Sequence, residues 1–128
     1  MNTKFLMMAS AIAMGIAGIF FTFLPEEIIS YAGFTITELN TLSLQILGAL
    51  YFAFAVLNWM ARANLIGGIY SKPVAMGNFA HFFIAGITLI KGALANQYVL
   101  SLWISGIIYS VFAIMFATVA FGNPLKND

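Results

Sequence analysis

The residues Tyr98–Phe121, YVLSLWISGIIYSVFAIMFATVAF, contain no charged side chain. A helix needs about 20 apolar residues to cross the hydrocarbon core of a bilayer, so this stretch predicts a membrane-spanning helix. Three further apolar stretches precede it, at residues 5–24, 39–61 and 74–94. The predicted fold class is therefore all-α: a polytopic membrane protein whose four spanning helices form an up-down-up-down bundle, as one domain over residues 1–128.

The composition agrees with this prediction. Of the 128 residues, 62% are hydrophobic and only 7% are charged. Soluble domains carry roughly 25% charged residues, and disordered chains need low hydrophobicity, so both classes are excluded. The net charge of +1 offers no basic face for nucleic acid. The chain has no cysteine, which excludes disulfides, iron–sulfur clusters and zinc–cysteine sites.

The connections between the apolar stretches carry helix start and stop signals. A short helix at residues 26–32, lying at the membrane interface, is expected to end near Gly33. Thr35–Glu38 has the spacing of a capping box that would begin the second span. Ser71 and Asn96 are the candidate N-caps of the third and fourth spans. Since these loops are short, neighbouring helices are expected to be antiparallel.

Basic residues in the connections predict the orientation. Most of them fall on one side of the expected bundle: Lys4, Arg62, Lys72 and Lys126. The other side receives Lys91 with the carboxylates Glu26, Glu27 and Glu38. The positive-inside rule then places both termini in the cytoplasm. Lys91 is expected either to extend its ammonium to the interface on its long stem or to pair with Glu38.

Small residues at four-residue spacing can bring membrane helices together, because lipid gives apolar helices no reason to associate. The candidates in the first span are Ala9, Ala13, Ala17, Ala11, Gly15 and Gly18. Those in the second and fourth spans are Gly48, Ala49, Ala53, Gly106 and Ser110, with Ser101 and Ser105. These residues predict packing within the chain, with a homo-oligomeric interface as the alternative.

Polar side chains inside a membrane are costly and are the default candidates for function. Asn58 and Arg62 share one face of the second span, and Asn78 and His81 share one face of the third. All four lie toward the expected cytoplasmic side, so adjacent antiparallel helices can bring them together. They are the tentative ligand-binding residues of this chain.

Each of these residues also has a structural interpretation. His81 can serve in acid–base chemistry or can be a neutral, hydrogen-bonded histidine. Asn78 can satisfy backbone groups, and Arg62 can mark the cytoplasmic side or clamp an anion such as a phosphate. No catalytic residue, metal site or cofactor is predicted, because one histidine without a nearby cysteine or buried carboxylate supplies too few ligands. The spans contain no Asp or Glu, which disfavours carboxylate-dependent exchangers and rotary proton-carrying subunits.

Three segments, residues 45–50, 58–62 and 73–82, resemble small four-helix bacterial membrane proteins of uncharacterised activity, loosely the DoxX-like group. The resemblance implies a bacterial inner-membrane protein. It transfers no functional residue.

Three functions are open at this point. The first is a non-enzymatic accessory or interaction module whose partners are the lipid bilayer and either further copies of itself or another membrane protein. The alternative is a binder or carrier of a lipid-like molecule in a cavity among spans two to four. The third is a membrane enzyme that uses His81 as an acid or a base.

Overall fold

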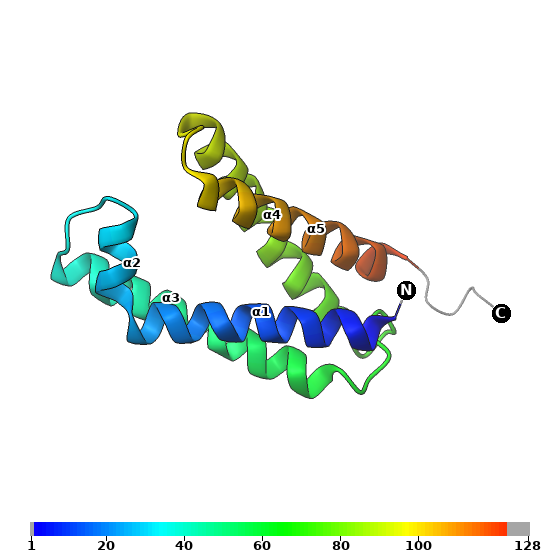
Figure 1. The fold of residues 1–128 in the computed structure, drawn as a ribbon. Helices are drawn as coiled ribbons and strands as arrows, with labels where there is room; N and C mark the ends of the chain where they lie inside the picture. The colour runs from blue at the N-terminus through cyan, green and yellow to red at the C-terminus, as the bar shows by residue number, and fades with distance from the viewer. Residues whose placement is uncertain (1, 123–128) are drawn as a thin grey trace. The chain divides into compact units, whose positions relative to one another are not determined.

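The computed structural model describes residues 2–122, which form five α-helices and no strand (Figure 1). The helices are α1 (Thr3–Phe23), α2 (Pro25–Tyr31), α3 (Glu38–Ala61), α4 (Lys72–Ala95) and α5 (Leu100–Phe121). All of them except α2 are long and apolar enough to cross a membrane. The predicted all-α class with four spanning helices is confirmed. Lys126, which contributes to the predicted orientation, lies outside the described residues.

The contacts divide the chain into two compact units. The first unit, Asn2–Ala63, contains α1 and α3 as an antiparallel pair, with α2 packed against both (Figure 1). The second unit begins at Asn64 and contains α4 and α5, which are also antiparallel (Figure 1). The expected up-down order therefore holds within each pair, and the single domain over the whole chain stays a prediction.

The helices of the first unit approach each other closely at two glycines. A Cβ atom added to Gly18 would lie 2.8 Å from the backbone nitrogen of Phe52 and 3.0 Å from the carbonyl oxygen of Gly48. One added to Gly48 would lie 2.9 Å from the backbone nitrogen of Thr22. Separations this short leave no room for a side chain, so the two backbones pack directly against each other. This is the close approach that small residues permit in membranes.

The buried face of α3 differs from one of the predicted small-residue stripes. Its buried residues are Gly48, Tyr51, Ala55 and Asn58, at spacings of three and four. Ala49 and Ala53 are exposed. Because each residue advances the helix by about 100°, the alanines face away from the seam that Gly48 defines. The predicted packing role is confirmed for Gly48 in the first unit, whereas Ala49 and Ala53 take no part in the seam with α1.

A glycine ends α2, as the sequence indicates. Gly33 has a positive φ of 78°. Its amide donates to the carbonyl of Ser30, and the amide of Phe34 donates to that of Ile29 at 3.1 Å. These two bonds form a Schellman motif, which satisfies the last carbonyl groups of the helix.

The caps of the following helices differ from the predicted ones. The N-cap of α3 is Thr37, whose Oγ1 accepts from the amide of Asn40 at 3.1 Å, while the Asn40 side chain donates to the carbonyl of Thr35. The predicted capping box on Thr35 and Glu38 is therefore wrong: the N-cap lies two residues later, at the extended Thr37, and the Asn40 side chain bonds the Thr35 carbonyl. Asn96 is the C-cap of α4 rather than the N-cap of α5, since its amide groups donate to the carbonyl of Gly92.

Ser71 stands at the N-cap of α4 as expected, but its side chain makes no cap hydrogen bond. Its carbonyl oxygen instead accepts from the amides of Val74 and Ala75. In this second unit, Gly86 lies against the Ser110 backbone, and Gly106 lies against Ile90. The predicted role of Gly106 and Ser110 in packing is confirmed.

The glycine contact of the first unit gives a direct test. Gly18→Ala is expected to lower the free energy of unfolding by about 1–3 kcal/mol, because the new methyl group meets backbone atoms that cannot rotate away. The matched control is Gly15→Ala, one turn earlier, whose Cβ would meet the Ala55 Cβ at an ordinary 3.6 Å. The free energy of unfolding of both variants is measured by unfolding in mixed micelles with increasing SDS, monitored by circular dichroism. Equal effects of the two substitutions would contradict the described crossing.

Candidate functional site

A buried hydrogen-bond chain ties α1 to α3. The side-chain Nδ2 of Asn58 donates to Oγ of Ser10 at 3.0 Å, and the Ser10 hydroxyl donates to the carbonyl of Met7 at 3.0 Å. Asn58 and Ser10 are both fully buried. A buried amide without a partner costs free energy, so this bond is part of what fixes the register of the two helices. Asn58, a predicted ligand-binding residue, therefore has a structural partner.

Ser10 is the residue that the sequence reasoning missed. It lies near the beginning of α1, as Asn58 lies near the end of α3, so both occupy the same half of an antiparallel pair. Matching the depth of polar residues on neighbouring helices would have found it. The sequence alone does not single out this hydroxyl, because a serine can also bond the preceding turn of its own helix.

Arg62 folds back on its own helix. As the C-cap of α3, it donates from one guanidinium nitrogen to the carbonyl of Trp59. Its guanidinium carbon lies 4.1 Å from the centre of the Trp59 ring. A cation over an aromatic face and near a helix C-terminus is favourably placed on both counts. The pair puts a positive charge and an amphipathic ring at one end of the spanning helix.

Asn78 and His81 belong to α4. Nδ2 of the buried Asn78 donates to the carbonyl of Val74, one turn earlier, at 2.9 Å. The His81 ring packs beside Phe82, with centroids 5.1 Å apart, and beside Tyr109 of α5 at 5.8 Å. Phe82 in turn stacks on Phe112 at 4.8 Å. His81 is thus a member of an aromatic cluster that joins α4 to α5.

The four predicted ligand-binding residues lie as two pairs. Asn58 and Arg62 are on α3 in the first unit, and Asn78 and His81 are on α4 in the second. Within residues 2–122, no three side chains of the metal-ligating types gather in one place. The cluster of all four residues stays a prediction.

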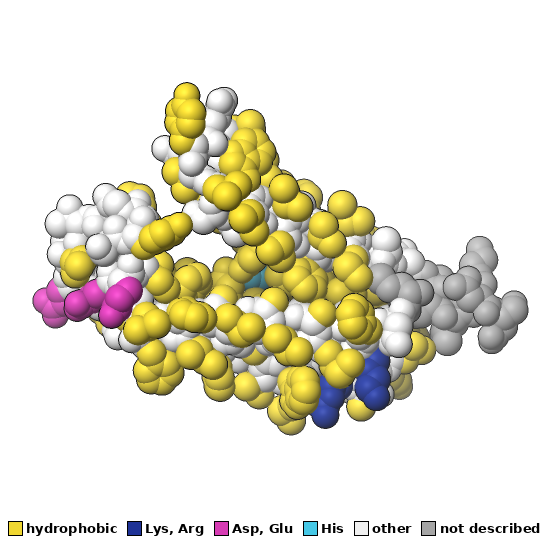
Figure 2. Space-filling model, in the orientation of Figure 1, with side chains coloured by type: hydrophobic (Ala, Val, Ile, Leu, Met, Phe, Trp, Pro, Cys, Tyr) yellow, Lys and Arg dark blue, Asp and Glu magenta, His cyan; other side chains and the backbone are white. Residues whose placement is uncertain are grey.

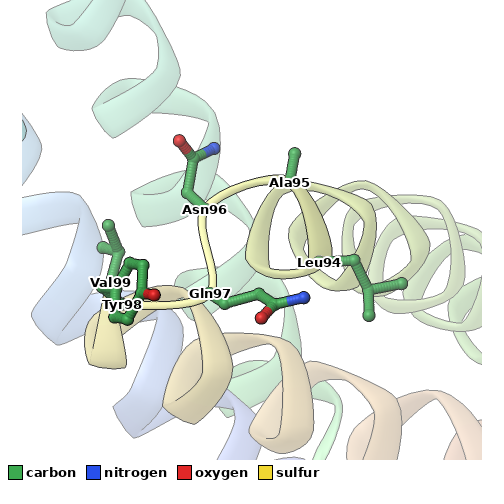
Figure 3. A pocket seen from close by; sticks show the side chains of 6 residues that line it. All are labelled: Leu94, Ala95, Asn96, Gln97, Tyr98 and Val99. Carbon is green, nitrogen blue, oxygen red and sulfur yellow. The ribbon is translucent and has the colours of Figure 1, made fainter.

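Two hollows whose linings include polar side chains lie at helix ends. One hollow, of about 330 Å³, follows the loop that connects α4 to α5 (Figure 3). It is lined by the consecutive residues 94–99, and Figure 3 shows the side chains of Asn96 and Gln97 pointing in different directions. Another, of about 430 Å³, lies beside the start of α3 and includes the carboxylates of Glu26 and Glu38. In the hollow at residues 94–99, the amides of Asn96 and Gln97 do not converge on one point, as the polar groups that orient a ligand do.

No protein-family model, curated protein or solved structure matches this chain. The assignment of a role therefore depends on the chemistry of its own residues.

The bond between Asn58 and Ser10 can be measured with a double-mutant cycle. Asn58→Ala and Ser10→Ala are expected to be coupled by about 1 kcal/mol, the scale of interhelical hydrogen bonds in membranes. The control cycle combines Asn58→Ala with Thr88→Ala. No coupling is expected there, because the exposed Thr88 hydroxyl donates to the carbonyl of Ile84 in its own helix. The measurement is the free energy of unfolding in mixed micelles. Additive losses for Asn58 and Ser10 would show that their bond contributes nothing.

Proposed function

We propose that the chain is an integral protein of a bacterial inner membrane that acts as a non-enzymatic accessory or interaction module. The resemblance to small DoxX-like membrane proteins supports the setting. The observation that carries the role is the use of its polar side chains. Those of Asn58, Ser10 and Asn78, which are buried, bond a partner helix or their own backbone. The bond from Asn58 to Ser10 holds two helices together, and the bond from Asn78 satisfies a buried amide within its own helix, which supports a structural use of these groups.

The outer faces of the helices support the same proposal. Large apolar side chains are exposed along every spanning helix, among them Ile16 of α1, Leu50 of α3, Ile84 of α4 and Ile107 of α5. Figure 2 shows that hydrophobic side chains cover most of the visible face. Surfaces of this kind fit lipid chains or the helices of another membrane protein.

The charges support an orientation with both termini in the cytoplasm. In the first unit, Lys4 and Arg62 lie where α1 begins and α3 ends, and the carboxylates of Glu26, Glu27 and Glu38 lie at the opposite end (Figure 2). In the second unit, Lys72 begins α4 and Lys91 lies near its far end. The positive-inside rule favours the cytoplasm for the ends that carry Lys4, Arg62 and Lys72.

Single cysteines test this orientation, because the natural chain contains none. A membrane-impermeant maleimide applied to intact cells is expected to label Thr35→Cys and Gln97→Cys, and to label Ser71→Cys only after the cells are opened. Ser71 is suitable because its side chain makes no cap hydrogen bond. The reversed labelling pattern would show that the termini lie outside the cytoplasm.

The role as a module is tested on the full-length protein released gently from its own membrane. Native mass spectrometry is expected to find a second membrane protein, or further copies of this chain, in fixed stoichiometry. Ile84→Arg places a charge on the exposed apolar face of α4 and tests whether the association uses that face. Ile107→Arg makes the same test on the exposed face of α5. A purified monomer that transports or converts a compound by itself would overturn the proposal.

A further inference from the structure

An apolar groove runs along the seam between α4 and α5, wholly within the second unit. It has a volume of about 290 Å³. On α4, the lining begins at Phe82 and ends at Lys91. These two residues are nine positions apart, which corresponds to about 14 Å along the helix axis. Small residues line its middle, since Gly86 has no side chain and faces the backbone of Ser110.

The groove has one cationic end. Its lining is otherwise apolar except for Ser110, whose hydroxyl donates to the carbonyl of Gly106 at 2.7 Å. Lys91 lies one turn before the end of α4 at Ala95, so its ammonium can reach the membrane interface while its methylene stem lines the groove. The result is an apolar slot that runs into the membrane from a positive charge at the interface.

We propose that this groove binds one acyl chain of an anionic phospholipid, with the lipid phosphate against the Lys91 ammonium. Charge and polarity match at each end, because an anionic headgroup near a lysine is favoured and the chain lies against apolar side chains. The volume is at the lower end of the range for small-molecule sites, so the groove accommodates one chain rather than a whole lipid.

The groove is open along its side, which favours a bilayer lipid over a soluble ligand. Its rims are Ile87 on α4 and Ile114 on α5, which are 47% and 66% exposed. In the second unit taken by itself, a lipid chain can therefore enter the groove through this open side. This site does not include Asn58, Arg62, Asn78 or His81, and it does not depend on the proposed partner interaction.

The test uses the full-length protein in detergent, titrated with phosphatidylglycerol or with phosphatidylcholine of the same acyl chains. Native mass spectrometry is expected to show saturable binding of one phosphatidylglycerol at lower concentration than phosphatidylcholine. Lys91→Gln is expected to weaken the binding of phosphatidylglycerol roughly fivefold, the effect of one lysine near a lipid surface. Lys91→Arg keeps the positive charge and is expected to retain the binding of phosphatidylglycerol.

Two matched controls separate the groove from general attraction and from misfolding. Lys72→Gln removes the lysine at the other end of α4 and is expected to leave the saturable site unchanged. Ile114→Trp narrows the groove and is expected to abolish the site, whereas Ile104→Trp, on an exposed part of α5 away from the groove, is expected to preserve it. Circular dichroism and thermal unfolding establish that each variant is folded.

Four results would overturn the proposal. Equal losses in Lys91→Gln and Lys72→Gln would reveal attraction to the whole charged surface, and equal binding of the two phospholipids would remove the role of the ammonium. If the protein retained oleate in preference to phosphatidylglycerol, and Lys91→Gln abolished that retention, the occupant would be a free fatty acid. A lipid-free dimer that Ile114→Trp dissociates would identify the groove as an interface between two copies.

Discussion

The contact between Gly18 and Gly48 is the constraint on which the first unit depends. In water, two apolar helices associate because burial removes their surfaces from solvent, but in lipid this driving force is absent. Association then requires many close van der Waals contacts, which weaken quickly as a gap opens. With a Cβ at either position the backbones would stand apart, and the contacts along the rest of α1 and α3 would weaken with them.

The hydrogen bond of Asn58 depends on the same close approach. A side-chain amide reaches a hydroxyl on a neighbouring helix only when the two backbones are near, and the observed 3.0 Å separation from Ser10 Oγ meets this condition. The bond in turn opposes sliding of one helix along the other, because a shift would bury an unsatisfied amide. The glycine packing brings α1 and α3 close together, and the bond between Asn58 and Ser10 fixes their position along the helix axes.

The spans could be predicted from the sequence because length and hydropathy alone determine which segments cross a bilayer. Local caps could not, because several residues compete for each one: Thr35 and Thr37 both offer a hydroxyl, and Asn96 can end α4 as well as begin α5. The buried face of α3 was ambiguous for a similar reason. Gly48 and Ala49 both begin small-residue stripes, and hydropathy does not distinguish a lipid-facing stripe from a packed one.

The candidate site was predictable in its residues and less so in their roles. Asn58 was identified because an amide inside a span is conspicuous, but its partner Ser10 was not, since a serine hydroxyl can be satisfied by its own helix. The side chains of Asn58, Ser10 and Asn78 are buried and hydrogen-bonded, and the outer faces of the spanning helices are largely apolar. To recognise a lipid on such a face, a protein needs a groove that selects the acyl chain and a charge near the membrane interface that orients the headgroup. The seam of α4 and α5 combines the two at Lys91, where an acyl chain and an anionic headgroup can be recognised together.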